Sequence, residues 1–291
     1  MTPLPQALIL ALAFCFSLPL AQISGTLQAQ AVHADSTLAA AHRLFAEANL
    51  LANRGHHDQA ESKLLRVLSM REKALGLDHP DVALTLHNLG FIYNAQDRYA
   101  EAEPLLRRAL AIRETVLGPQ HLEVALTLNS LAFTYGVQSR YDEAEPLYER
   151  ALAIDEIVLG PNHLEVAHVL SNLGMLYDDL GRYAEARPVY ERVLAIREAA
   201  LGLSHPDVAN ILINLASLYH HQRRYAEAVP LYRRSLDIRR AELGPEHSDT
   251  SLALENLILA CELLFALPDV VQEQRSITTP ESMAMLCRLS P

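Results

Sequence analysis

The chain has 291 residues, of which half are apolar, so it is long and apolar enough to bury a sizeable core. Its formal net charge of −11 gives it a surface that repels nucleic-acid phosphates and anionic lipid. Nucleic acid is therefore excluded from the expected partners, and so is membrane insertion beyond the N-terminal segment.

The N-terminal segment 1–34 contains no Asp, Glu, Lys or Arg. Its apolar run Leu8–Leu18 has the length of a signal-peptide core and is too short to span a membrane comfortably as a helix. Residues 29–31 (AQA) match a small-residue cleavage site. The segment therefore predicts export to the periplasm or the cell exterior. Because no basic residue precedes the apolar run, an uncleaved N-terminal anchor is the alternative.

Four units of 42 residues follow without insertion or deletion and fill residues 75–242. Residues 35–74 are expected to form degenerate N-terminal helices, and 243–291 a degenerate repeat with a C-terminal cap. A fixed period of this length indicates stacked supersecondary units, none of which can bury its apolar face alone. The units begin at Leu75, Leu117, Leu159 and Leu201.

Each unit has the pattern of two helices. In the first unit an apolar stripe with helical spacing runs from Val82 to Tyr93. This helix is expected to begin at residues 78–81 (DHPD), where Asp78 and Asp81 have capping-box spacing. It should end near residues 96–98, and a second helix should end at Gly118, before a proline.

One proline and two small residues recur in every unit. The prolines fall inside the second helix and are expected to bend it without ending it, because apolar periodicity continues beyond them. The small residues should let the two helices of a hairpin approach closely. The prolines are 104, 146, 188 and 230, and the small residues are Gly90, Ala132, Gly174 and Ala216, with Ala102, Ala144, Ala186 and Ala228.

Histidine recurs at one position of every unit, and arginine recurs at more than one. The histidines lie too far apart to share a metal ion at ligand distances near 2 Å, so we expect them to bond to backbone at the junctions. The arginines and glutamates are expected to form exposed charge networks that contribute little each. The histidines are His79, His121, His163, His205 and His247; the charged pairs include Arg98–Glu101, Arg140–Glu143, Arg182–Glu185 and Arg224–Glu227.

The pattern NLGxxYxxxxRYxEAxPLYxRAL resembles the tetratricopeptide repeat (TPR) over about residues 40–266. The 42-residue period and the LGxxHPxVA junction resemble the longer subclass seen in kinesin light chains. The resemblance implies an all-α fold, a TPR solenoid in which antiparallel helix hairpins form a right-handed superhelix. It further implies a non-enzymatic interaction scaffold without cofactors, which binds a peptide or protein segment in a concave groove lined by the first helices. The sequence contains no GxSxG, P-loop or HExxH motif of the kind that would suggest an enzyme.

The resemblance places a groove wall on the first helices, apolar in the first two repeats and polar in the next two. The asparagines could hydrogen-bond the backbone of an extended peptide, or else bond to the neighbouring repeat. The apolar side chains could anchor a ligand, or else be covered by superhelix curvature. The candidate residues are Asn88, Phe91, Asn129, Phe133, Asn172, Met175, Asn214 and Asn256. The family's Asn and Lys clamp for a terminal carboxylate is absent, because Phe91, Phe133 and Met175 stand at the asparagine position.

Two weaker candidates lie toward the C-terminal end. One is the cluster formed by Asp178, Asp179, His220 and His221, which could bind a divalent metal. Alternatively, its carboxylates could raise the pKa of its histidines into the range of a pH switch. The alternative is a solvated acidic patch. Cys261 and Cys287 could form a disulfide, or remain two buried thiols.

The expected function is therefore a monomeric scaffold for a protein or peptide partner. A self-assembling structural array is the main alternative, and a metal- or pH-responsive binding module is a further one.

Overall fold

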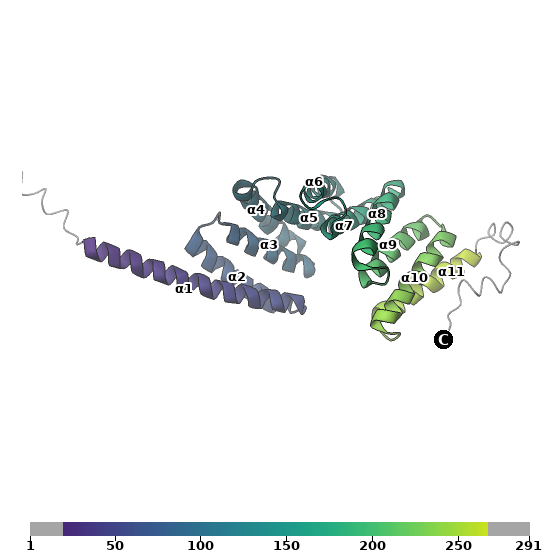
Figure 1. The fold of residues 1–291 in the computed structure, drawn as a ribbon, viewed down its shortest axis with the longest axis horizontal. Helices are drawn as coiled ribbons and strands as arrows, with labels where there is room; N and C mark the ends of the chain where they lie inside the picture. Colours follow the sequence, from purple (N-terminus) through teal and green to yellow (C-terminus); the bar gives the residue numbers. More distant parts are fainter. Residues whose placement is uncertain (1–19, 267–291) are drawn as a thin grey trace, which may run out of the picture. The chain divides into compact units, whose positions relative to one another are not determined.

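The computed structural model describes residues 20–266, and all secondary structure in this range is helical (Figure 1). Short turns join the helices in pairs, which confirms the predicted all-α fold of helix hairpins. The helices are α1 (Leu20–Asn53), α2 (His57–Leu75), α3 (Pro80–Ala95), α4 (Tyr99–Leu117), α5 (Leu122–Val137), α6 (Tyr141–Leu159), α7 (Leu164–Asp179), α8 (Tyr183–Leu201), α9 (Pro206–His221), α10 (Tyr225–Leu243) and α11 (Ser248–Ala266).

The chain divides into two compact units, residues 1–112 and 113–291. In the described range the first contains α1 to α3 and most of α4, and the second contains the end of α4 and α5 to α11. The predicted leader run Leu8–Leu18, the cap beyond Ala266 and Cys287 lie outside the described residues. No helix among residues 20–266 is long and apolar enough to cross a membrane.

A histidine caps the first helix of each hairpin from α3 onward. Nδ1 of His79 accepts a hydrogen bond from the backbone N–H of Asp81 at 3.1 Å, and extended backbone at His79 turns the chain into α3. The predicted bonding of these histidines to backbone is confirmed. The expected Asp78–Asp81 capping box is wrong, because the cap falls one residue later. The same bond is made by His121, His163, His205 and His247.

The helices end where the sequence predicts. The first helix of the first full unit has its C-cap at Gln96, and the second ends at Leu117, before Gly118 with φ of 88°. Each second helix with an internal proline is 19 residues long and continues on both sides of that proline. The proline therefore does not end the helix, as expected.

Small residues allow close contact within each hairpin. A Cβ added at Gly174 in α7 would lie 2.5 Å from Cε1 of Tyr190 in α8, and one at Gly90 would lie 2.6 Å from Cγ of Leu106. Ala132 and Ala216, at the equivalent positions, are fully buried. The predicted close approach of the paired helices is confirmed.

Replacing Gly174 by alanine is expected to destabilise the second unit by about 2 kcal/mol, because the buried Tyr190 ring must move to admit the new methyl group. Gly136 in α5 provides the matched control, since nothing lies within 4 Å of the Cβ that Gly136→Ala would add. That change should be neutral or slightly stabilising. Urea unfolding of both variants measures the difference, and equal midpoints would contradict the close contact.

Two sets of arginines connect successive hairpins. In the exposed set, Arg150 pairs with Glu114 and also donates to the backbone oxygen of Pro119. Arg108, Arg192 and Arg234 repeat this arrangement on Glu72, Glu156 and Glu198. The predicted pairs such as Arg182–Glu185 also form, with Arg182 stacked 4.4 Å above the Tyr177 ring. These charge networks are partly exposed, as expected.

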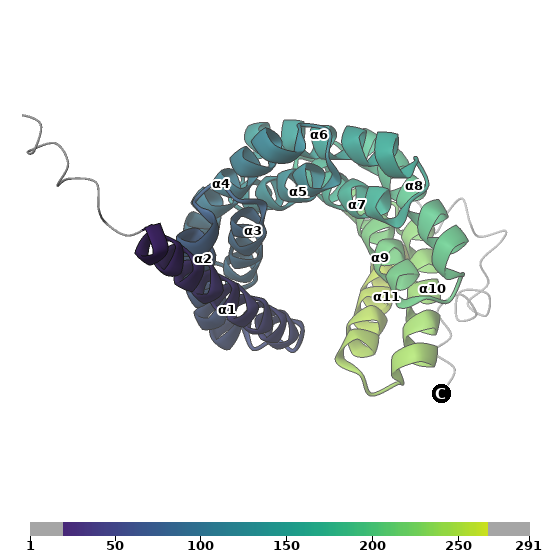
Figure 2. The same cartoon turned by 60° about the vertical axis from the view of Figure 1, so that its left-hand side comes forward.

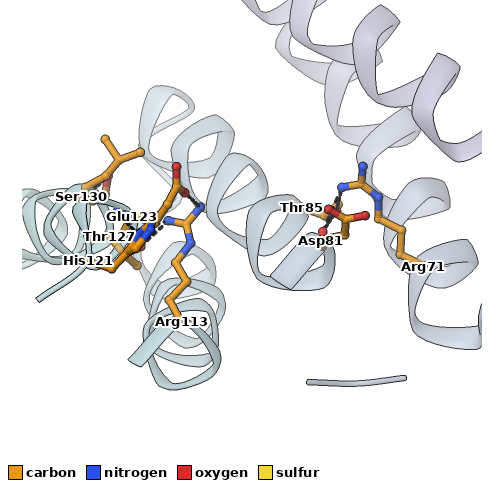
Figure 3. A network of polar contacts seen from close by, with 9 residues as sticks. Arg71, Asp81, Thr85, Arg113, His121, Glu123, Thr127 and Ser130 are labelled. Atoms are coloured by element: carbon orange, nitrogen blue, oxygen red, sulfur yellow. Dashed lines mark hydrogen bonds and ion pairs between the residues drawn. The ribbon is translucent and has the colours of Figure 1, made fainter. Parts of the chain in front are cut away.

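The second set, which we call the junction arginines, was not predicted as structural. These residues lie on second helices, 42 or 84 residues apart, and each donates from Nη1 to the backbone oxygen of the residue ten positions later. Figure 3 shows Arg71 against Asp81 and Thr85, and Arg113 against Glu123 and Thr127. The set is Arg71, Arg113, Arg197 and Arg239, of which Arg71, Arg113 and Arg239 are buried.

Candidate functional site

In the second unit, α5, α7 and α9 pack side by side in one row, and α6, α8 and α10 form the other (Figure 2). The alternation follows from the hairpin repeat, because each first helix stacks on the first helix of the next unit. We call the surface of α5, α7 and α9 away from their paired helices the first-helix face. Of the predicted groove residues on these helices, Met175 is exposed, Phe133, Asn172 and Asn214 are half-buried, and Asn129 is buried.

Apolar side chains remain accessible on this face. Met175 in α7 is 39% exposed and Leu126 in α5 is 40% exposed. Phe133 in α5 is less accessible than these two, but it is not fully buried. In the first unit, Phe91 on α3 is 56% exposed. Within their own units these residues are therefore not hidden in the core, and they can contact a ligand.

The asparagines fall into two groups. Nδ2 of Asn172 donates to Oδ1 of Asn129 at 3.0 Å, and in the first unit Asn88 donates to Asn49 at 3.0 Å. These bonds join neighbouring hairpins, so these asparagines follow the alternative in which they bond to the neighbouring repeat. Asn214 and Asn256 are half-buried and make no side-chain hydrogen bond to another residue in the described range. An amide in this second group keeps its donors and acceptor for a ligand.

The acidic and histidine cluster forms one contact. Nδ1 of His221 lies 3.0 Å from Oδ1 of Asp178, and the ring of His220 meets that of Tyr225 edge-on. Burial, with His221 beside it, lowers the pKa of His220, so the expected upward shift is wrong for this residue. Burial and then Asp178 raise the pKa of Asp179.

This cluster does not supply a metal site. Between residues 20 and 266, no three His, Cys, Asp or Glu side chains come together in a way that could hold an ion. The weak metal candidate formed by Asp178, Asp179, His220 and His221 is therefore dropped. Its one contact, between Asp178 on α7 and His221 on α9, joins two neighbouring hairpins instead.

Cys261 in α11 is 5% exposed and disulfide-bonded. It packs in a core cluster with Leu257 and Leu264. Its predicted pairing with Cys287 lies outside the described residues and stays a prediction.

A cavity of about 180 Å³ lies where α5, α6 and α7 meet. Its apolar part includes Leu126, and its polar part includes His168 and also Asn129, which was predicted for the groove wall. Its acidic residues were not predicted to belong to a site. They are Glu123 of α5, Asp155 of α6 and Glu165 of α7.

Asp155 is the most unusual residue of this cavity. This residue is 6% exposed, and burial raises its pKa to about 6, with Glu165 adding to the shift and His163 opposing it. It occupies the position that the junction arginines hold in the neighbouring 42-residue repeats, 42 residues after Arg113 and 42 before Arg197. Comparison of the units at this position would have revealed the exception from sequence.

The sequence matches a family model described as tetratricopeptide repeat over residues 36–115, 81–156, 123–199 and 207–265. No curated protein matches it significantly.

Solved structures share the fold. BtubC (BKLC) from P. vanneervenii has 26% identity and a TM-score of 0.60, over 75% of this chain and 92% of that one. A kinesin light chain-related repeat protein from Podosopora anserina has 26% identity and a TM-score of 0.58, over 69% of this chain and 95% of that one. RapI in its apo form has 17% identity and a TM-score of 0.60, over 86% of this chain and 96% of that one.

Proposed function

The chain belongs to the tetratricopeptide-repeat family, and from that premise we propose that it is a non-enzymatic scaffold that binds an extended protein segment on its first-helix face. The observation that carries the proposal is the accessible apolar surface of Met175 and of Leu126, which also lines the cavity between α5, α6 and α7. Exposed apolar side chains next to a concave site are typical of protein recognition.

The chemistry of this face suits a peptide backbone with apolar side chains. Met175 can adapt its shape to an apolar side chain, because its thioether chain is flexible. Asn214 on α9 offers amide groups that no other described side chain occupies. Such groups bond to an extended backbone without reading its sequence. The identity of the bound segment would then depend on the apolar anchors and on the cavity.

Selection of a peptide library on the immobilised chain tests the proposal. For a selected peptide, Met175→Ala is expected to weaken binding about tenfold, because an interface anchor contributes more than about 1 kcal/mol. Ile157→Ala is the control, since Ile157 in α6 is 76% exposed and lies on the second row of helices. Isothermal titration measures both dissociation constants.

Equal weakening by both variants, or by neither, would contradict binding on the first-helix face. Light scattering over a range of concentrations separates the scaffold from the self-assembling array. An average molar mass that increases with protein concentration in the absence of peptide would favour the array. A constant mass equal to that of the monomer supports the scaffold.

We also propose that the chain is exported, with residues 1–34 as a signal peptide or, if uncleaved, an anchor. The support is the absence of Asp, Glu, Lys and Arg from this segment and the AQA sequence at 29–31. N-terminal sequencing of the expressed chain tests this: a start after residue 31 or 34 indicates cleavage, and an intact, cytosolic N-terminus rejects export.

A further inference from the structure

The junction arginines establish a rule that one hairpin breaks. Between α8 and α9, Arg197 donates from Nη1 to the backbone oxygen of Asp207, and between α10 and α11, Arg239 donates likewise to Asp249. Between α6 and α7 the equivalent residue is Asp155. A carboxylate cannot donate these bonds, so the backbone oxygen of Glu165 has no arginine donor.

The reversed charge leaves Asp155 without a partner. Asp155 is 6% exposed, lines the cavity, and makes no hydrogen bond or ion pair with any other residue in the described range. Glu165 and Glu123 also border the cavity, and Glu123 is already paired with Arg113. A buried carboxylate with acidic neighbours is unfavourable unless a cation pairs with it.

The cavity has room for such a cation. Its volume of about 180 Å³ is more than ten times the ~10–15 Å³ that a single water needs. Its apolar lining consists of Leu122, Leu126, Leu159 and Val169. A long side chain can bury its methylene stem against residues of this kind while its charged end reaches the carboxylate.

We propose that this cavity binds the guanidinium of an arginine carried by the partner segment, in the place of the missing junction arginine. The inference rests on the proposed function, because the arginine arrives with a segment bound to the first-helix face. A planar guanidinium can pair with the Asp155 carboxylate through two N–H groups and still donate to the backbone oxygen of Glu165. A lysine ammonium lacks this fork, so arginine is the better fit.

The protonation of Asp155 supplies a second expectation. With its pKa raised to about 6 by burial, the carboxylate is mostly neutral at pH 5 and mostly ionised at pH 7. A guanidinium binds the ionised form, so binding should strengthen as the pH rises through 6. The other titratable groups that face the cavity are Glu123 of α5, and Glu165 and His168 of α7, while His163 precedes α7.

The probe is the tripeptide acetyl-Gly-Arg-Gly-amide, with a citrulline tripeptide as its uncharged counterpart of similar shape. Both are titrated into the full chain by NMR, following amide signals of α5, α6 and α7. The arginine peptide is expected to bind at least tenfold more tightly than the citrulline peptide at pH 7, and to lose this advantage at pH 5. Equal binding of the two peptides at pH 7 overturns the proposal.

Variants of Asp155 locate the site. Asp155→Asn keeps the shape and removes the charge, so it should weaken the arginine peptide about tenfold. Asp155→Arg places a guanidinium in the cavity and should abolish binding. Asp142→Asn, an exposed carboxylate on the same helix, is the control and should bind like the unchanged chain. Binding unchanged in both Asp155 variants refutes the assigned site.

The two levels of the proposal fail differently. If a library-selected peptide loses affinity in Met175→Ala but not in Asp155→Arg, the scaffold stands and the arginine pocket is wrong. If the arginine tripeptide depends on Asp155 while no library peptide depends on Met175, the pocket stands and the first-helix face is not the wider binding surface.

Discussion

Asp155→Arg is expected to stabilise the second unit by about 1–2 kcal/mol at pH 7, against the usual direction of a core substitution. The raised pKa of Asp155, about 6 against an ordinary value of 3.8, sets an upper bound of about 3 kcal/mol at roughly 1.4 kcal/mol per pH unit. Solvent screening at the cavity reduces this bound by about half. Arginine removes this unfavourable carboxylate. It can also donate to the backbone oxygen of Glu165, as Arg197 does to Asp207. These bonds offset the desolvation of the new guanidinium.

The pH dependence of this gain has a definite sign. Because the pKa of Asp155 is raised in the folded chain, folding is opposed by ionisation of this group and not by its protonation. The penalty is absent below the unfolded pKa of about 4, grows as the pH rises to about 6, and stays constant above it. The advantage of the arginine variant should therefore be smaller at pH 4.5 than at pH 7.

Urea unfolding followed by circular dichroism at both pH values measures this advantage. The control is Asp142→Asn, in which an exposed carboxylate is neutralised on the same helix and little change is expected. An arginine variant that is less stable than the unchanged chain at pH 7 would show that the cavity cannot admit a guanidinium. That result would also weaken the inference of an arginine ligand, since the two share the same geometry.

The sequence period predicted the parts of the fold that depend on local spacing. The helix ends at Gln96 and Leu117, the backbone-bonded histidines, and the close contact at Gly174 all follow from residues that recur every 42 positions. These features are local or involve only the two helices of one hairpin. Periodicity is sufficient for them, because each unit presents the same residues to the same neighbours.

Contacts between hairpins were harder to predict. The bond from Asn172 to Asn129 depends on how one first helix is rotated against the next, which spacing alone does not determine. Arg113 was not singled out in the sequence, yet its side chain crosses the junction and is 2% exposed. Asp155 could have been noticed, since it interrupts a column of arginines, but its burial and its cavity required the packed structure.

Arg113→Ala is the second change with a large expected effect, a loss of about 3 kcal/mol in the stability of the second unit. The guanidinium donates to the backbone oxygen of Glu123 and to Oγ1 of Thr127, and it pairs with the Glu123 carboxylate (Figure 3). Removing it leaves the buried Thr127 hydroxyl without this donor and opens space between α4 and α5. Breaking a buried, hydrogen-bonded ion pair typically costs 3–5 kcal/mol, and the partial exposure of Glu123 puts this case at the lower end.

Arg150→Ala is the matched control for this loss. Arg150 also crosses a hairpin junction, from α6 to Glu114 and Pro119, but its side chain is 39% exposed. Water can replace its bonds, so less than about 1 kcal/mol should be lost. Urea unfolding of the two variants side by side measures the contrast. If both lose the same stability, burial is not what distinguishes the junction arginines, and the special status of position 155 in the array would lose its physical basis.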